Sequence, residues 1–252
     1  MGLALLKLGG SVVTFKDKPL SVNKNAINKI SRVLSKVKKP LIVVHGGGSF
    51  GHYYSVKYDI HTKPASYDLH AVSLVKSSMI QLNDHIVSIM AKNRLNPYTV
   101  PPSALMHGAK SIKSKIRELK QLALSGLIPV TYGDVLHYSN RSYYILSGDA
   151  LMSIIAKELK PDIALFALNV DGVYRDLRGK ELVREISAGR QAKFSQVSAD
   201  VTGGMVRKMR EAFKISRMGI DVLMVNGLKP ERIVNALKNK KFEGTIVKGV
   251  KK

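Results

Sequence analysis

The chain has 252 residues, 45% of them hydrophobic and 23% charged, which excludes collagen-like, coiled-coil and disordered proteins. It contains no cysteine, so disulfides, thiol nucleophiles and zinc–thiolate sites are excluded as well. Its 41 Lys and Arg against 18 Asp and Glu give a formal charge of +23, which favours an anionic partner or a strongly solvated surface.

The basic residues are spread along the whole chain rather than gathered in one segment, and aromatic residues make up only 6%. The aromatic residues do not alternate with the charges as base-stacking platforms would. We therefore expect mainly a solvated basic surface, with capture of small anions as the alternative and no nucleic-acid partner. No apolar run approaches the roughly 18 residues of a membrane helix. Signal-peptide features are also missing, because Lys7 and Gly9-Gly10 interrupt the first apolar run. These features predict a cytoplasmic protein with no membrane partner.

Short apolar runs alternate with stretches of helical spacing along the chain. In chain order, we expect a strand at 3–8, a helix at 27–37, strand 41–44, helix 69–90, strand 98–100, helix 112–124, strand 127–131, a hairpin over 136–146 turning at Asn140-Arg141, helix 150–159, strand 163–168, helix 205–218, strand 222–225, helix 231–237 and strand 245–247. The polar segment 174–201 is expected to be a loop with small strands. This alternation predicts an α/β protein, an open three-layer αβα sandwich with a mostly parallel central sheet.

Ligands of open parallel sheets bind beyond the carboxyl ends of the strands. Four segments are expected there: Gly9-Gly10-Ser11, Gly46–His52, Ser147-Gly148-Asp149 and Asn169–Tyr174. Glycine turns let backbone amides approach a ligand closely and form an anion cradle. Two such turns after two strands indicate two phosphate-bearing ligands, or both ends of one phosphoryl transfer.

Two familiar nucleotide motifs fit poorly. No Walker A string is present, and Gly46–Gly51 matches Gly-x-Gly-x-x-Gly only formally, because it follows the second strand and His70 stands where an acid is needed. Lysines border the glycine turns instead, at Lys7, Lys16 and Lys208. Such point charges suit phosphoryl transfer, whose transition state spreads negative charge over the transferred group.

Three strings resemble the amino acid kinase family in order and separation: Lys7–Ser11 with Lys16, Asn169–Tyr174 and Thr202–Lys208. The resemblance extends from Lys7 to the final Gly244-Thr245-Ile246. Within the family, the string His45–His52 resembles the archaeal type of isopentenyl phosphate kinases. Uridylate, acetylglutamate and aspartate kinases typically lack a histidine at the position of His52.

The resemblance implies an ATP-dependent kinase that converts isopentenyl phosphate to isopentenyl diphosphate in isoprene biosynthesis by the mevalonate pathway. It also implies a Mg²⁺ requirement and a homodimer. Residues 1–160 would form a lobe for the phosphate acceptor and residues 161–252 a lobe for ATP, within one domain. A family kinase acting on another small anion, such as a uridylate-like nucleotide, a carbamate or a phosphonate, stays open as the alternative.

Roles carry over residue by residue from the resemblance. The expected catalytic residues are Lys7, Lys16, His52 and Asp149. The expected ATP-binding residues are Lys7, Gly9, Gly10, Ser11, Gly48, Asp171, Tyr174, Gly203 and Lys208. The expected acceptor-binding residues are Gly47, Gly48, His52 and Gly148. No side chain is expected to ligate a metal, so Mg²⁺ would be held by ATP oxygens and water. The face of Val75, Met79, Leu82 and Ile86 is either an isoprenoid slot or ordinary core.

Overall fold

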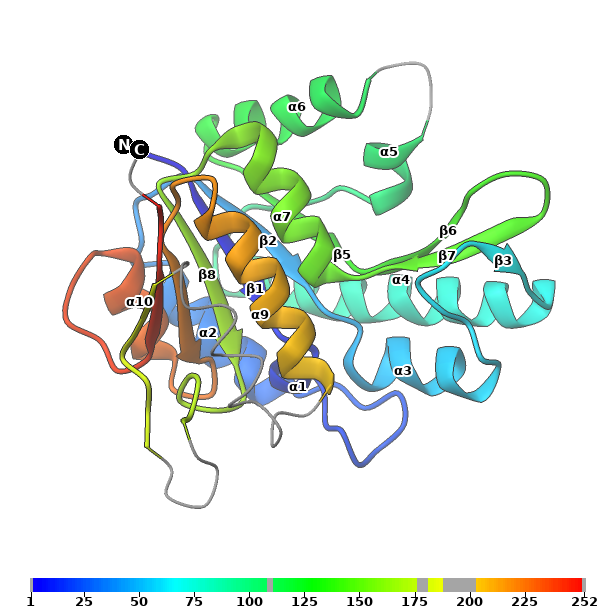
Figure 1. Ribbon diagram of the computed structural model, residues 1–252, viewed down its shortest axis with the longest axis horizontal. Coiled ribbons are helices and arrows are strands. Elements are labelled where there is room, and N and C mark those ends of the chain that lie inside the picture. Colours follow the sequence, from blue (N-terminus) through cyan, green and yellow to red (C-terminus); the bar gives the residue numbers. More distant parts are fainter. Residues whose placement is uncertain (1, 108–110, 176–180, 188–202, 251–252) are drawn as a thin grey trace.

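The computed structural model describes residues 2–107, 111–175, 181–187 and 203–250. Eight strands form one sheet in the order β4-β5-β2-β1-β8-β10-β11-β9 (Figure 1). Their bounds are β1 Ala4–Leu8, β2 Leu41–His45, β4 Pro97–Thr99, β5 Ile128–Tyr132, β8 Ile163–Leu168, β9 Glu185–Ser187, β10 Val222–Asn226 and β11 Thr245–Lys248. Neighbouring strands run parallel except β10 and β11, which are antiparallel. The predicted mostly parallel sheet is confirmed.

Helices cover both faces of this sheet (Figure 1). One face carries α5 Pro102–Met106, α6 Ile112–Leu124, α7 Gly148–Leu159 and α9 Gly203–Ser216. The other carries α1 Gly10–Val13, α2 Lys24–Leu34, α4 Leu69–Lys92 and α10 Pro230–Leu237. Alternate residues of the buried strands feed the two cores, as Leu5 and Leu6 of β1 do. The result is the predicted three-layer sandwich. None of the helices in the described ranges is long and apolar enough to cross a membrane.

A smaller unit projects from the β2–β5 half of the sheet. It contains α3 Gly48–Lys57 and a three-stranded antiparallel sheet of β3 Ala65–Ser66, β7 Ser142–Leu146 and β6 Asp134–His137. The β6–β7 hairpin turns at Asn140 and Arg141, which both have positive φ (41° and 63°). The predicted hairpin and its turn are therefore confirmed.

Most predicted elements exist with small shifts of their ends. Helix α6 and strand β8 have the predicted bounds, and α2 is capped by Asn23, whose side chain accepts from the Ala26 amide at 3.1 Å. The prediction that Gly46–His52 is only a turn was wrong, because the chain continues from Gly48 into α3. Strand β9 confirms a small strand within 174–201, whereas residues 176–180 and 188–201 lie outside the described residues.

Candidate active site

The glycine turns that follow β1 and β2 lie side by side at the carboxyl edge of the sheet. The Gly9 amide donates to the Ala167 carbonyl of β8, and the Gly46 amide donates to the Leu8 carbonyl of β1, each at 2.9 Å. The strand order β2-β1-β8 therefore brings the ends of all three strands together. One backbone amide of the first turn is already engaged here.

The first two turns touch through their backbones. A Cβ on Gly10 would lie 2.3 Å from the Gly48 amide nitrogen, and a Cβ on Gly48 would lie 2.0 Å from Thr14 Oγ1. Gly48 also has φ of +49°, which is costly for other residues. Thr14 Oγ1 donates to the Gly10 carbonyl at 2.8 Å and accepts from the Ser49 amide at 2.9 Å. Glycine is required at both positions because no side chain fits between the turns.

A buried ion pair lies beneath these turns. Lys7, next to the last residue of the buried strand β1, points its Nζ at Asp149 Oδ1 at 2.8 Å, with the two side chains 4% and 12% exposed. Lys208 of α9 approaches the other carboxylate oxygen of Asp149 at 3.7 Å. Asp149 thus links two lysines from different elements. This arrangement brings together three of the predicted site residues.

Charge and burial compete in this group. Burial alone would raise the pKa of Asp149, but the charges of Lys7 and Lys208 outweigh it and hold that pKa below its ordinary value. Burial lowers the pKa of Lys208; Asp149 opposes this shift, and the nearby cations Lys7, Arg207 and Lys16 add to it. The side chains therefore form a compact cationic centre with a single carboxylate holding it together.

His52 lies on the exposed side of α3 and faces the same cationic centre. Desolvation by its surroundings lowers the pKa of His52, and the charges of Arg207, Lys208 and Lys16 lower it further. The lowered pKa favours the neutral imidazole, which has one N–H to donate. Arg207 was not among the predicted site residues, although it directly precedes Lys208 in the string that was singled out.

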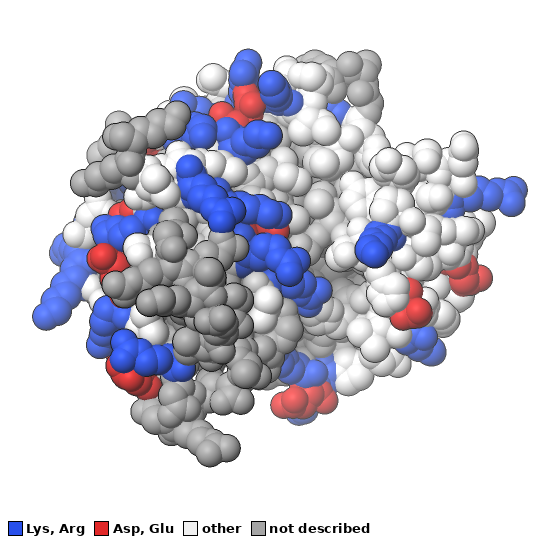
Figure 2. Space-filling model, in the orientation of Figure 1, with Lys and Arg blue, Asp and Glu red and all other residues white. Residues whose placement is uncertain are grey.

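Three helices begin at this edge of the sheet. The N-terminal ends of α3, α7 and α9 converge beside α1 (Figure 1), and α7 is capped by Ser147, which accepts from the Ala150 amide at 3.1 Å. Helix N-termini carry partial positive charge and unpaired amides, so they attract anions. Figure 2 shows Lys and Arg side chains in a band over α9, whereas the surface over α3 and the β6–β7 hairpin is mostly uncharged. The edge is therefore suited to phosphate groups.

The glycines predicted to bind the acceptor lie next to buried side chains at this edge of the sheet. A Cβ on Gly148 would lie 2.9 Å from the His45 carbonyl oxygen and 3.3 Å from Cε of Lys7, so the backbone passes directly over the lysine. A Cβ on Gly47 would lie 3.1 Å from Sδ of Met79. Met79 and the rest of the apolar face of α4 at Val75, Leu82 and Ile86 are almost fully buried. Of the two alternatives for this face, core packing fits the burial.

Buried His45 shapes the second turn without taking part in ion pairing. Its ring stacks on Tyr132 with 5.1 Å between centroids, and its Nε2 lies 3.3 Å from Asn83 Oδ1. Burial lowers the pKa of His45 to about 4, which keeps the ring neutral. His45 is therefore a packed residue at the end of β2.

The loop after β8 is fixed by contacts that the sequence did not reveal. Ser11 Oγ donates to Asn169 Oδ1 at 3.0 Å, joining the first turn to this loop. Asp171 Oδ1 accepts from Asn226 Nδ2 at 2.9 Å and Arg232 Nη1 at 2.6 Å, and it also pairs with Lys229 at 3.2 Å.

The hydrogen bond from Asn226 contributes most to lowering the pKa of Asp171, to about 2, and the two cations add to it against partial desolvation. Asp171 therefore anchors the loop to α10. Tyr174 pairs with Leu182 in an isolated bridge, and Gly203 begins α9.

The carboxylates at this edge of the sheet indicate whether side chains could bind a magnesium ion. Within the described residues, no group of three or more His, Asp or Glu side chains converges on one point. Asp149, the carboxylate at the centre of the site, is engaged by two lysines. The chemistry of this donor set fits an ion that brings most of its ligands with it, as phosphate oxygens and water.

Comparisons with known proteins agree with this geometry. The model of the family described as "Amino acid kinase family" matches residues 2–226. An isopentenyl phosphate kinase from Thermoplasma acidophilum is 35% identical over 252 residues, covering 98% of this chain and 100% of the relative. One from Methanothermobacter thermautotrophicus is 28% identical over 265 residues, covering 98% and 99%.

The same likeness is found among solved structures. The crystal structure of the T. acidophilum isopentenyl phosphate kinase product complex has a TM-score of 0.82 at 31% identity, covering 98% of this chain and 100% of that one. The chain therefore belongs to the amino acid kinase family, and it resembles isopentenyl phosphate kinases over nearly its whole length.

Proposed function

We propose that this protein is an ATP-dependent kinase that phosphorylates isopentenyl phosphate, giving isopentenyl diphosphate and ADP. The observation that carries the proposal is the contact between the two glycine turns directly above the Lys7–Asp149 pair. Two phosphate-bearing ligands seated on the two turns would meet over one buried cation. The full-length likeness to isopentenyl phosphate kinases supports the choice of acceptor.

The chemistry needs positioning and charge neutralisation more than a base. An oxygen of the acceptor phosphate, already ionised at neutral pH, attacks the γ-phosphorus of ATP. A new P–O bond forms while the bond from the γ-phosphorus to the β,γ-bridging oxygen breaks, and ADP leaves with that electron pair. Lys7 would stabilise the transferred group, with Lys16 and Lys208 on the other phosphate oxygens. Asp149 would hold Lys7 and Lys208 in place.

His52 would select and orient the acceptor. A neutral imidazole donates one hydrogen bond, and the phosphate dianion would favour protonation of the ring once it is bound. Gly47, Gly48 and Gly148 leave room for the acceptor phosphate to approach the backbone closely. ATP would rest on Gly10, Ser11, Gly48 and Gly203, with Tyr174 at its border. Asp171 would act mainly by holding the loop.

Magnesium is proposed as part of the ATP complex. The ion would neutralise developing charge on the β and γ phosphates, and its ligands would be phosphate oxygens and water. We further propose that residues 1–160 supply the acceptor lobe and residues 161–252 the ATP lobe, joined through the pairing of β1 with β8. A cytoplasmic location fits a cysteine-free enzyme that uses ATP.

A homodimer is proposed from the resemblance to the family. Helix α4 leaves Leu69 and Ile80 exposed, by 58% and 50%. Single exposed apolar side chains are ordinary on a protein surface, so these two residues support the proposal only if they belong to a larger apolar patch. Light scattering coupled to size-exclusion chromatography measures the mass directly, and a monomer at micromolar concentration would contradict the proposal.

A release assay for ADP with four acceptors tests the function. The acceptors are isopentenyl phosphate, dimethylallyl phosphate, UMP and fosfomycin, each with Mg²⁺ and ATP. We expect kcat/KM to be highest for isopentenyl phosphate. Faster turnover of UMP or fosfomycin would assign the enzyme to another small anion, which is the alternative within the family. Omission of Mg²⁺ should abolish turnover in every arm.

A further inference from the structure

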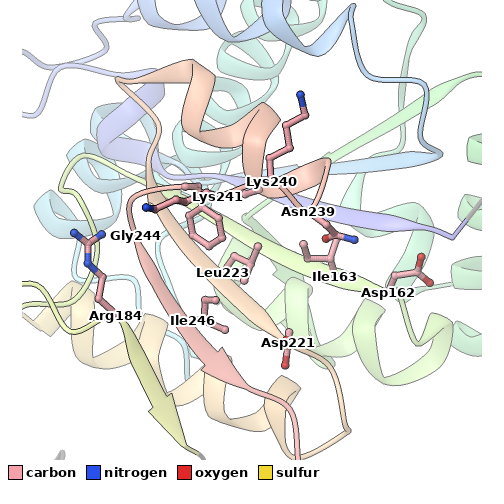
Figure 3. A pocket seen from close by; sticks show the side chains of 12 residues that line it. Asp162, Ile163, Arg184, Asp221, Leu223, Asn239, Lys240, Lys241, Gly244 and Ile246 are labelled. Carbon is pink, nitrogen blue, oxygen red and sulfur yellow. The ribbon is translucent and has the colours of Figure 1, made fainter.

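A second cavity lies away from the phosphate edge. It has a volume of about 670 Å³ and opens between the end of α10, the segment 239–243 and the face of β8, β10 and β11 (Figure 3). Its lining includes Ile163 and Asp221, at the amino ends of β8 and β10, whereas the phosphate edge is at their carboxyl ends. The cavity also lies on the α10 face of the sheet, opposite α9. Its size is within the range of small-molecule sites.

The floor of this cavity is apolar. Ile163 and Leu223 project from neighbouring strands and are each 5% exposed. Ile246 and Phe242 are partly buried beside them and pack against the same core. The surface that these side chains present to the cavity continues the hydrophobic layer beneath α10. A bound apolar chain lying on this surface would be removed from water.

The mouth of the cavity is cationic. Arg184 precedes β9 and Lys241 follows α10, and Figure 3 shows both cationic ends on the same side of the cavity, while Lys240 points away from it. Among the described residues, neither Arg184 nor Lys241 forms an ion pair with an acidic side chain. An adjoining hollow of about 520 Å³ shares both residues and adds Arg232.

The acidic residues of the two hollows already have partners. Asp162 pairs with Lys39 at 3.5 Å, and Asp221 with Lys248 at 3.0 Å, both at the far end of the cavity. Glu243 pairs with Arg232. The like charges of Arg184 and Lys241 are therefore left facing a shared space, where an anion would stabilise both.

We propose that this cavity binds an amphiphilic anion, a diphosphate or phosphate ester that carries a prenyl chain. The anionic head would be held by Arg184 and Lys241, and the chain would lie on Leu223 and Ile246 beside the Phe242 ring. The choice of a prenyl chain rests on the proposed function, whose product is a diphosphate with an apolar tail. Condensation of two such diphosphates forms a C–C bond, breaks the C–O bond to one diphosphate and releases it as inorganic pyrophosphate; the longer prenyl diphosphate that results would fill more of the floor.

Occupancy of this cavity has a route to the ATP side. Arg232 lines the adjoining hollow and bonds at once to Glu243 and to Asp171, the anchor of the loop after β8. An anion beside Arg184 and Lys241 would draw Arg232 away from Asp171 and loosen the loop. Binding of the prenyl diphosphate is therefore expected to weaken ATP binding, as feedback inhibition requires.

Methyl NMR with geranyl diphosphate as the probe tests the site directly. The protein is labelled at isoleucine δ1 methyls, and the resonances of Ile163 and Ile246 are assigned with the variants Ile163→Val and Ile246→Val. We expect both resonances to shift saturably. The Arg184→Ala/Lys241→Ala double variant should raise the dissociation constant about tenfold or more, because two charge-assisted contacts are lost. Lys238→Ala removes an exposed lysine outside the lining and should leave binding unchanged.

Two further probes separate the head from the chain. Inorganic pyrophosphate and geraniol should each bind at least tenfold more weakly than geranyl diphosphate. Pyrophosphate binding as tight as that of geranyl diphosphate would show a general anion site and overturn the proposal. The proposal would also be overturned if the Ile246 resonance did not shift, or if the double variant bound geranyl diphosphate as tightly as the wild type. These titrations contain no ATP or acceptor, so they fail or succeed independently of the kinase activity.

Calorimetry tests the link to ATP. Saturating geranyl diphosphate should weaken ATP binding several-fold in the wild type, and the Arg184→Ala/Lys241→Ala variant should lose this effect. Loss of the effect identifies the cavity as its origin, since binding of geranyl diphosphate at the phosphate edge would compete with ATP in both proteins. An equal effect in both proteins would refute the link.

Discussion

Replacing Asp149 with Asn removes the carboxylate that links Lys7 to Lys208 while keeping the size of the side chain. The carboxylate lies 2.8 Å from the first ammonium and 3.7 Å from the second. At an effective dielectric constant of about 20, these separations correspond to attractions of about 6 and about 4.5 kcal/mol. Desolvation of the three charges offsets most of this sum, and removal of one partner from a buried pair typically costs about 3–5 kcal/mol. We expect a loss of that size in the free energy of unfolding at pH 7.

The stability difference between wild type and Asp149→Asn should depend on pH in a defined direction. The folded-state pKa of Asp149 is depressed, so its contribution to stability is complete above the ordinary carboxyl pKa and is lost as pH falls through the depressed value. The asparagine of the variant does not titrate. The difference in stability between wild type and variant should therefore be largest near neutrality and should shrink in acid below the ordinary carboxyl pKa of 3.8.

Urea unfolding at a series of pH values measures both effects. Asp162→Asn is a matched control, because Asp162 pairs with Lys39 at 3.5 Å but is 53% exposed. An exposed pair contributes about 1 kcal/mol or less. An Asp149→Asn protein as stable as the control, or a stability difference that does not change with pH, would refute the assigned charge balance. In the same variant kcat should fall at least about tenfold, because the two lysines lose the group that orients them.

Substitutions at Lys7, His52 and Gly48 probe the turns and the acceptor side, with Gly126→Ala as a control. Lys7→Ala should lower kcat about 10²-fold or more and change ATP affinity much less, since its charge acts on the transferred group; near-normal turnover in steady-state kinetics would contradict this role. His52→Ala should lose turnover with isopentenyl phosphate at unchanged ATP affinity and unchanged circular dichroism, and His52→Asn should retain more activity. Because the pKa of His52 is lowered, kcat/KM should not fall as pH rises through 6.5 in the wild type. Gly48→Ala should unfold more easily and bind ATP poorly, whereas Gly126→Ala, with φ of +94° but open space around its Cβ, should cost only about 1–2 kcal/mol in thermal or urea unfolding.

The parts of the fold that follow from local patterns were predictable. Strand 163–168 is one uninterrupted apolar run because both faces of β8 are buried, and helix 112–124 shows the spacing of a half-buried helix. Helix α3 carries no such pattern. It has only Ser49 and Phe50 buried, and it is held by the contact of the Ser49 amide with Thr14, a residue 35 positions earlier.

Some residues of the site could also be predicted from the sequence, and others could not. The glycines and lysines near strand ends could be predicted as site residues from the sequence, because ligands bind at the carboxyl ends of the strands in a parallel sheet. The partners of Asp171 could not. Arg232 is 61 residues away in the chain and Asn226 is 55 away, so only the approach of α10 to the loop after β8 brings them together. Arg184 and Lys241 likewise become neighbours only when β9 and β11 pair.

The charges of the cationic centre favour anionic ligands at this edge of the protein. Lys7, Lys16, Arg207 and Lys208 act on one another there, and Asp149 is the carboxylate that holds two of them. Repulsion among these cations adds to the desolvation that lowers the pKa values of Lys208 and His52, so the charged forms of both side chains are disfavoured there. Phosphate groups on the two glycine turns would supply the missing negative charge and favour the charged form of both residues. An uncharged ligand would leave the repulsion in place, so we expect the centre to bind phosphates in preference to uncharged ligands.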